Sequence, residues 1–415
     1  MQAEIITIGD EILIGQTIDS NSAWIAGELN KAGIRVSRIN SIADEASAIN
    51  AGLDESLGRV DLVLMTGGLG PTADDITKKT LADYFGMPLV MNEEVLADIR
   101  GFFDRIGKPM LEMNEQQAML PAGAHIVRNR KGTASGMWFE KEGKVLISMP
   151  GVPYEMVHLM ESGFMDMIES RFRRGHVFHR TVMTFGQGES FIADTVKDWE
   201  AGLASTGVKL AYLPSPGIVK MRLSAFGDDS EELERKVMDQ AIALERLIPD
   251  IVYGYDDETL EAVVAGLLKE KGKTISAAES CTGGYISHLL TSIPGSSDYL
   301  EGGLCTYSYA SKTELLGVDS EIIKEKGAVS EEVVIAMAEG CRKLYQTDIA
   351  IAVSGIAGPS GGTPDKPVGT VWMAVAHEDG MFTHCFHFGR DRMRNIRMTA
   401  LHALNEVRRI LLARG

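Results

Sequence analysis

Two kinds of hydrophobic pattern alternate along the chain. Residues 3–8 read as a strand, and residues 62–65 form a continuous apolar run of the kind found in strands buried on both faces. Residues 21–31 instead place their apolar side chains at helical spacing. Strands that alternate with helices predict a parallel sheet covered by helices. Ligands of such sheets bind beyond the carboxyl ends of the strands.

The same patterns predict three domains, which suits a chain of 415 residues, too long for one ordinary core. The pattern over residues 1–173 predicts an α/β domain. Residues 174–250 predict a small α+β domain with a helix over 231–248, followed by a linker over 249–257. Residues 258–415 predict a second α/β domain, whose first helix covers 259–271 and whose strands cover 274–277, 349–353 and 370–376.

Composition narrows the class of partner. The formal net charge of −17 opposes binding to a polyanion, so we expect a small-molecule ligand and no nucleic acid. The four cysteines form no C-x-x-C pair, which argues against a structural zinc site. We see no signal peptide and no apolar run of membrane-spanning length, so we expect a cytoplasmic protein without a membrane partner.

The strand over 274–277 runs into the segment 278–284, Ala-Glu-Ser-Cys-Thr-Gly-Gly, at a predicted strand-to-helix turn. Backbone N–H groups at such a turn can hold an oxyanion or a phosphate beside Ser280. A serine hydroxyl needs a base, and Lys312 is the candidate if burial lowers its pKa. Tyr309 is a candidate to relay or position the proton.

Two other interpretations of this segment stay open. Ser280 can be a helix cap with Lys312 at the surface. Alternatively, Cys281 can be the nucleophile, with a pKa lowered by the helix N-terminus, beside Glu279 and Lys312. In the simplest picture Cys281 packs inward as a small apolar residue.

Several separated motifs of the last domain resemble the nicotinamide-nucleotide amidase (NMN deamidase) family. They are the segment 278–284, the pair Tyr309 and Lys312, and the segments 327–330, 354–359 and 366–371. The resemblance implies hydrolysis of nicotinamide mononucleotide to nicotinic acid mononucleotide and ammonia by a serine–lysine pair, Ser280 and Lys312, without a cofactor. It also implies a substrate-binding set, with Arg392 and Arg397 on the phosphate: Glu279, Thr282, Gly283, Gly284, Ser354, Gly355, Ala357, Gly358, Arg392 and Arg397.

A second constellation lies in the first domain, in the segments 9–15 and 66–77. Glycine loops there suit a phosphate. Asp74 and Asp75 can stabilise a helix dipole or, together with Asp10, hold a divalent cation against a pyrophosphate.

The first domain resembles the molybdopterin-binding-like fold, which implies three layers, and the whole chain resembles the competence/damage-inducible protein A (CinA) family. That family is associated with metal-dependent ADP-ribose pyrophosphatase activity. The resemblance implies a divalent metal, with potassium as a further candidate, and Asp10 and Asp75 as metal ligands. It implies the following nucleotide site: Gly9, Asp10, Glu11, Thr66, Gly67, Gly68, Gly70, Thr72 and Asp74. One departure is Ser135, where the family often has proline.

Three functions follow as hypotheses. The first is a bifunctional hydrolase of pyridine-nucleotide salvage, and the family resemblance adds a homodimer. The second keeps the amidase but makes the first domain a non-catalytic pterin- or nucleotide-binding module. The third is a DNA-uptake partner, which the net charge opposes.

Overall fold

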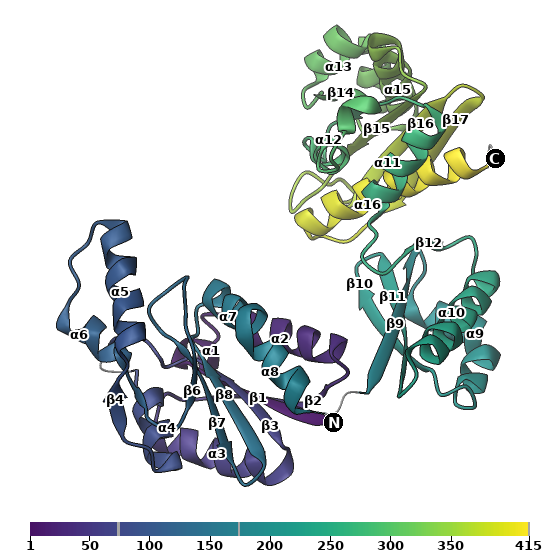
Figure 1. The fold of residues 1–415 in the computed structure, drawn as a ribbon. Helices are drawn as coiled ribbons and strands as arrows, with labels where there is room; N and C mark the ends of the chain where they lie inside the picture. The colour runs from purple at the N-terminus through teal and green to yellow at the C-terminus, as the bar shows by residue number, and fades with distance from the viewer. Residues whose placement is uncertain (73–74, 173–174, 414–415) are drawn as a thin grey trace. The chain divides into compact units, whose positions relative to one another are not determined.

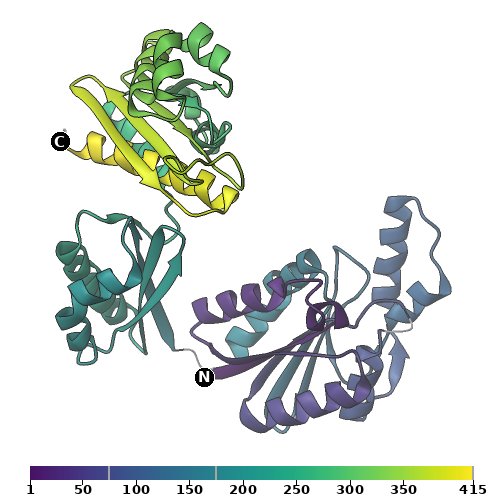
Figure 2. The same ribbon diagram turned by 180° about the vertical axis from the view of Figure 1, so that it is seen from behind.

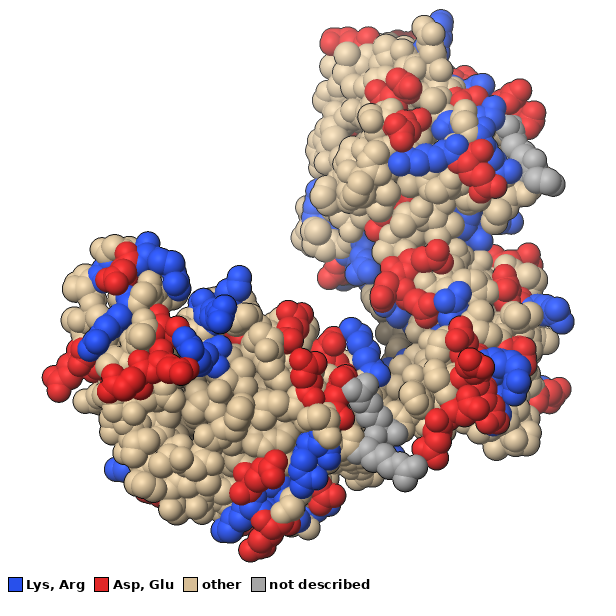
Figure 3. Space-filling model, in the orientation of Figure 1, with Lys and Arg blue, Asp and Glu red and all other residues tan. Residues whose placement is uncertain are grey.

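The computed structural model describes residues 1–72, 75–172 and 175–413, and the chain divides into two compact units. The first unit comprises residues 1–178 with 226–233. The second comprises residues 179–225 with 234–415. Acidic and basic side chains are interspersed over the visible face of each unit (Figure 3). Among the described residues, no helix is both long and apolar enough to cross a membrane.

The first unit is built on a six-stranded sheet with the order β2-β1-β3-β8-β7-β6. Neighbours among the first four strands are parallel, and the last two strands are antiparallel to their neighbours. The strands, in chain order, are β1 (Gln2–Ile8), β2 (Arg35–Ile42), β3 (Leu62–Thr66), β6 (His125–Val127), β7 (Gly136–Lys141) and β8 (Lys144–Met149).

Helices cover both faces of this sheet (Figures 1 and 2). Neighbouring residues of β1 point to opposite faces, so Ile5 packs in the core beneath one layer and Ile6 in the core beneath the other. The first layer contains α2 (Ser20–Lys31), α7 (Pro153–Leu159) and α8 (Met165–Arg171). The second contains α3 (Ala46–Arg59), α4 (Thr77–Phe85) and α5 (Glu93–Ile106). The predicted three-layer α/β domain is confirmed.

The carboxyl ends of the four parallel strands lie at one edge of this sheet. Ile8 pairs with Ile42, and Thr66 pairs with both Thr7 and Met149. The order of strands reverses at β1, because β2 lies on one side of it and β3 on the other. Such a switch point is where open α/β sheets bind their ligands.

The second unit begins with a four-stranded sheet of order β10-β11-β9-β12. Its strands are β9 (His176–Phe185), β10 (Lys209–Ser215), β11 (Ile218–Gly227) and β12 (Val252–Tyr255), and its helices are α9 (Glu189–Leu203) and α10 (Ser230–Leu247). The predicted linker over 249–257 is wrong in one respect: it contains β12, which pairs with β9 through Val252 and Thr184. The small α+β domain therefore continues past residue 250.

The rest of the second unit is a five-stranded sheet of order β14-β13-β15-β16-β17. Its strands are β13 (Ile275–Glu279), β14 (Leu300–Cys305), β15 (Ile349–Gly355), β16 (Thr370–His377) and β17 (Gly380–His387). One face is covered by α11 (Leu260–Lys271), α12 (Tyr285–Thr291) and α16 (Arg392–Leu412). The other is covered by α13 (Tyr309–Leu316), α14 (Ser320–Lys326) and α15 (Glu331–Tyr345).

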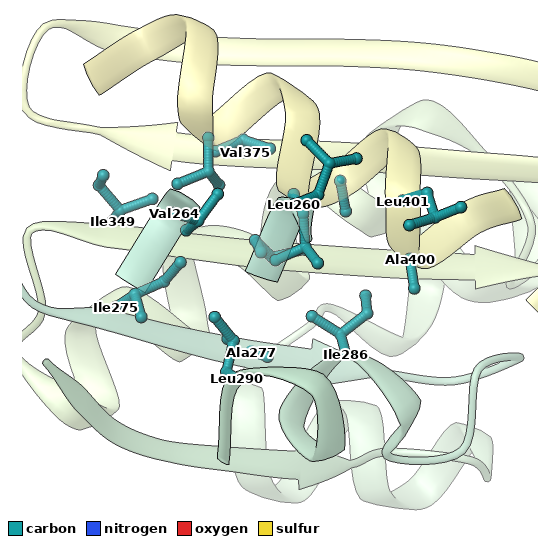
Figure 4. Close-up of a cluster of buried hydrophobic side chains, with 14 of the residues drawn as sticks. Leu260, Val264, Ile275, Ala277, Ile286, Leu290, Ile349, Val375, Ala400 and Leu401 are labelled. Atoms are coloured by element: carbon teal, nitrogen blue, oxygen red, sulfur yellow. The ribbon is translucent and has the colours of Figure 1, made fainter. Parts of the chain in front are cut away.

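The core under α11 and α16 is continuous with the small sheet. Figure 4 shows Leu260 and Val264 of α11 facing Ala400 and Leu401 of α16 over the strands. The same cluster includes Phe185 of β9. The two sheets of the second unit therefore share one hydrophobic core.

Shorter elements complete the chain. They are the helices α1 (Asp10–Leu13) and α6 (Glu112–Glu115), the strands β4 (Leu89–Met91) and β5 (Met119–Pro121), a π-helical turn at Met160–Phe164, and 3-10 turns at Gln116–Ala118 and Ser296–Asp298.

Candidate functional site

Ser280 directly follows β13, a buried strand between β14 and β15. Its backbone N–H donates to the carbonyl of Val353 (3.1 Å), which extends the pairing of β13 with β15 by one residue. The side chain is 8% exposed. The serine is therefore held on the sheet, at the carboxyl end of its parallel strands.

Lys312 reaches Ser280 from the first turn of α13. Its Nζ donates to Ser280 Oγ (3.1 Å) and to the carbonyl of Thr306 (2.6 Å). The side chain is 1% exposed, and burial lowers the pKa of the amine. Neither hydrogen-bond partner is charged, so nothing in this pair offsets the loss of water around an ammonium ion. The interpretation of Lys312 as a surface residue is wrong.

Cys281 packs away from this pair. It lies in a small apolar cluster with Ala357 and Val371. Burial raises the pKa of its thiol to about 12, so it carries no thiolate near neutral pH. The structure therefore favours Ser280 as the nucleophile and Cys281 as a small apolar residue.

Glu279 holds the turn together and does not face a ligand. It is fully buried, and its two oxygens accept five hydrogen bonds, from Thr282 Oγ1, the N–H groups of Gly284, Ile286 and Ser287, and Ser287 Oγ. A carboxylate beside the N-terminus of a helix satisfies donors that the helix leaves unpaired. The prediction of Glu279 as a substrate-binding residue is corrected to a positioning role. The Thr282 hydroxyl likewise donates to Glu279 within the turn.

The turn after Ser280 bends through two glycines. Gly283 and Gly284 have φ values of 62° and 96°, a region that favours glycine. In the described part of the chain, no other residue accepts from the backbone N–H of Cys281 or Thr282. These two N–H groups flank the nucleophile and are candidates for an oxyanion site.

The second predicted loop, Ser354–Gly358, forms a wall beside the first. Its backbone carbonyls are held by α16: Asn395 Nδ2 donates to Ala357 O (3.0 Å) and Arg392 Nη1 to Gly358 O (2.9 Å). The Ser354 hydroxyl is buried and donates to Ala328 O (2.7 Å). The side chains of Ser354 and Ala357 therefore support the loop, and only its backbone is left for a ligand.

A side chain at position 355 would not fit in this loop. A Cβ there would stand 2.6 Å from Val371 Cγ2 and 2.9 Å from the carbonyl of Thr370. Gly355 therefore lets the loop lie against β16.

The two arginines that were predicted to bind the phosphate lie in different surroundings. Arg392, at the start of α16, bonds the Gly358 carbonyl, and its Nη2 lies 3.5 Å from the hydroxyl of Tyr307. Arg397 is exposed and forms no hydrogen bond or ion pair with any residue that the structure describes. The structure thus brings Arg392 to the site and leaves Arg397 outside it.

Tyr309 does not contact the pair that it was expected to serve. It is 64% exposed, and its hydroxyl forms no hydrogen bond with Ser280 or Lys312. The structure therefore does not bring Tyr309 to the pair, and its predicted role as a proton relay has no support from these contacts.

Sequence reasoning missed three residues of the site. Thr306 supplies the carbonyl that anchors Lys312, Tyr307 contacts Arg392, and Asn395 ties two loops together through Ala357 and Gly389. A usable signal existed for Asn395, which lies one helical turn after Arg392 and thus on the same face.

The predicted glycine loops of the first unit lie at the carboxyl edge of its sheet. Gly9 directly follows β1, and its N–H donates to Ile42 O (3.3 Å). Gly67 follows β3, and its N–H donates to Met149 O (3.0 Å). A Cβ on Gly67 would stand 2.1 Å from the carbonyl oxygen of Ile8, so the loop crosses directly over the end of β1.

The remaining predicted residues of this edge have unequal surroundings. Thr66 is buried at the end of β3, and a Cβ on Gly68 would collide with Thr77. Asp10 and Glu11 are exposed in the first turn of α1.

Asp75 stabilises the loop that precedes it. Its carboxylate accepts from the N–H of Gly70 (2.8 Å) and from the N–H and hydroxyl of Thr72 (2.9 and 2.5 Å). Asp75 therefore stabilises the loop before α4, which is neither the helix-dipole role nor the metal-ligand role predicted for it.

Comparison with known proteins adds the family. Three family descriptions match in succession: a probable molybdopterin binding domain over residues 4–169, the damage-inducible protein CinA KH domain over 179–254, and the CinA C-terminal domain over 257–411. A CinA-like protein of Cytophaga hutchinsonii is 48% identical over 99% of this chain and 98% of its own length. The chain belongs to the CinA family.

A second relative matches nearly the whole chain, and a solved structure matches part of it. A CinA-like protein of Flavobacterium psychrophilum is 43% identical over 99% of both chains. Among solved structures, the competence/damage inducible protein CihA from Agrobacterium tumefaciens is 36% identical, with a TM-score of 0.35, over 37% of this chain and 92% of its own.

The CinA assignment does not by itself provide a metal site. Among residues 1–72, 75–172 and 175–413, no group of three or more histidine, cysteine, aspartate or glutamate side chains is arranged to hold a metal ion. Asp75 is committed to its own loop, and Asp74 lies outside the described residues. The described donors therefore do not fit a divalent cation on their own.

Proposed function

We propose that the last domain of this CinA-family chain is a serine–lysine amidase that converts nicotinamide mononucleotide to nicotinic acid mononucleotide and ammonia. The observation that carries the proposal is the 3.1 Å contact between Lys312 Nζ and Ser280 Oγ, with both side chains buried. A neutral amine in this position can take the hydroxyl proton as the oxygen attacks a carbonyl carbon.

The residues suggest the following sequence of steps. Ser280 Oγ attacks the carboxamide carbon, and its proton passes to Lys312 Nζ. The N–H groups of Cys281 and Thr282 hold the oxyanion. When the tetrahedral intermediate collapses, the C–N bond breaks and Lys312 gives its proton to the departing nitrogen, which leaves as ammonia. Water, deprotonated by Lys312, then hydrolyses the acyl-serine ester and releases the carboxylate.

Arg392 supports a nucleotide substrate. Its guanidinium is fixed against Gly358 O beside Tyr307, and its planar donors suit a phosphate. We therefore place the substrate phosphate at the start of α16 and assign no phosphate contact to Arg397.

A mutant panel on the full-length chain tests this function. We expect Ser280→Ala and Lys312→Ala each to reduce ammonia release from the mononucleotide by about a thousandfold or more. Cys281→Ala is the matched control and should keep most of the activity, because the thiol is neutral and packed inward. An active Ser280→Ala together with an inactive Cys281→Ala would show that the serine assignment is wrong.

For the first unit we propose hydrolysis of ADP-ribose to AMP and ribose 5-phosphate. The supporting observation is the meeting of the Gly9 and Gly67 loops at the switch point of the sheet. AMP formation by a Ser280→Ala chain is the expected result, and it is measured with and without a chelator because the described donors do not fit a divalent cation on their own.

Other outcomes of that experiment separate the competing functions. Saturable ADP-ribose binding without AMP formation would instead favour the binding module. Salt-sensitive binding of DNA by the pure chain would favour the DNA-uptake partner.

A further inference from the structure

A cavity of about 560 Å³ lies in the second unit, where the small sheet joins the last domain. It is bounded by β12, α11 and α16, and Figure 1 shows these elements meeting there. None of the residues predicted for the amidase or nucleotide sites lines it. Its volume is within the range of cavities that bind small organic molecules.

The cavity carries an excess of negative charge. Three carboxylates line it, from Glu245, Glu258 and Glu270, against one guanidinium, from Arg408. That guanidinium is already directed at protein acceptors, the carbonyls of Val252 (2.9 Å) and Asp250 (3.2 Å) and the side chain of Asn405. The remaining field repels phosphates and attracts cations.

Two of the carboxylates are held in place within the protein. Glu258 accepts from the N–H of Tyr255 (2.7 Å), and Glu245 accepts from the hydroxyl of Tyr255. Glu270, at the end of α11, has no partner in the described part of the chain. The cavity thus has two fixed anionic groups and a third that is available to a ligand.

Tyr253 provides an observation independent of the charges. It lines the cavity and is 6% exposed, yet its hydroxyl forms no hydrogen bond to any described residue. Burial, with Glu261 and Glu258 nearby, raises its pKa to about 12, so the hydroxyl is neutral. The hydroxyl oxygen is not among the fully buried polar atoms that lack a partner, so it opens onto the cavity, where water or a ligand can bond to it.

Between these polar groups, the cavity is lined by apolar side chains and by a glycine without a side chain. Ala262, Val263 and Leu267 of α11 line the cavity, together with Gly266 in the middle of the same helix. A Cβ on Gly266 would meet no atom within 4 Å. A ligand that fits therefore needs an apolar body as well as positive charge.

We propose that this cavity is a binding site for a small organic ammonium compound, such as an aliphatic diamine, separate from both proposed hydrolase sites. Ammonium groups pair with Glu270 and the other carboxylates, the hydrocarbon chain lies along α11, and the Tyr253 hydroxyl accepts one N–H. The ligand would bridge the small domain and α16, whose first turns carry Arg392 and Asn395.

Isothermal titration calorimetry of the full-length chain with 1,4-diaminobutane tests the proposal at low salt. We expect saturable one-site binding that weakens as sodium chloride is raised. 1,4-Butanediol has the same carbon chain without charge and should not bind. Equal binding of the diol, or no saturable binding of the diamine, overturns the proposal.

Variants then locate the site. Glu270→Gln should weaken binding about two- to fivefold, and Tyr253→Phe up to about tenfold. Gly266→Leu, which places a side chain in the cavity, should abolish binding. The matched control is Glu339→Gln, the same charge change at an exposed position of α15. Equal affinity in all four variants would show that the diamine is attracted only by the net charge of −17.

Discussion

At the scale of single residues, burial decides the chemistry more than residue type does. Lys312 and Tyr309 lie one turn apart on α13, and both were predicted to act. Lys312 is 1% exposed beside Ser280, whereas Tyr309 is 64% exposed. The sequence pattern singled out both residues, but which of the two is buried depends on packing against distant elements.

The role of Glu279 also could not be predicted from its residue type. Its type suggested a contact with substrate, but the structure uses its carboxylate for five hydrogen bonds within the turn. Spacing alone does not show which donors of a turn lack partners.

The lowered pKa of Lys312 predicts the pH dependence of the proposed amidase. Lys312 acts as a base only when it is neutral, so the rate constant for ammonia release should be low in acid and rise with pH. Because burial lowers its pKa from 10.5, the rise should be complete at a lower pH than for an exposed lysine. Initial rates of the wild-type chain between pH 5.5 and 10 measure this.

The residual activity of Lys312→Ala is the control for that profile and should lack the same rise. A wild-type rate that keeps increasing up to pH 10 would show that burial does not lower the pKa of the amine.

At the scale of elements, apolar runs located the buried strands well. The prediction over 62–65 matches β3, and that over 349–353 lies within β15. Strand β2 (Arg35–Ile42) is harder to find from the sequence, because it is an edge strand with mostly exposed side chains and a weak hydrophobic pattern. Helix α9 was not predicted, and only the structure places it in the small domain.

The glycine loop after β3 allows a prediction at this scale. Gly67 has a φ of 110° and lies over the Ile8 carbonyl, so Gly67→Ala should destabilise the first unit by about 1–3 kcal/mol. Differential scanning calorimetry of the full-length chain would show the transition of that unit at a lower temperature.

Gly58→Ala is the matched control. Gly58 lies in α3, and a Cβ there would meet no atom within 4 Å. Alanine favours a helix over glycine by about 1 kcal/mol, so this variant should be slightly more stable than the wild type. A Gly67→Ala chain as stable as Gly58→Ala would contradict the close approach of the two loops.

At the scale of the whole molecule, sequence patterns gave the succession of α/β, α+β and α/β regions but misplaced a junction. The segment 249–257 looked like a linker because of its proline and acidic residues, yet it supplies the edge strand β12. Because β12 pairs with β9, a strand some seventy residues earlier in the chain, the sequence around β12 does not indicate that it forms a strand.

The shared core of the second unit should be sensitive to acid. His402 of α16 packs against the rings of Phe185, Phe386 and Phe388, and burial, aided by His384, lowers its pKa from 6.5 to about 4. The unfolded chain therefore binds more protons than the folded chain between pH 6.5 and 4. Stability from this residue is fully present above pH 6.5 and is lost as pH falls towards 4.

Replacement by phenylalanine keeps a ring but removes the titrating group. Calorimetry at pH 7 and pH 4.5 should show a smaller acid-induced drop in the melting temperature of the second unit for His402→Phe than for the wild type. Identical drops would mean that His402 is readily protonated in the folded chain.

The contacts of Arg408 bear on where the chain can be divided into fragments for expression. Its guanidinium is 5% exposed and is held by the carbonyls of Asp250 and Val252. A fragment that begins at residue 258 keeps the guanidinium but deletes both acceptors, and it also strips Phe185 from the shared core. Poor yield or low turnover of that fragment would report damage caused by the cut, whereas a fragment that begins at residue 179 keeps these contacts.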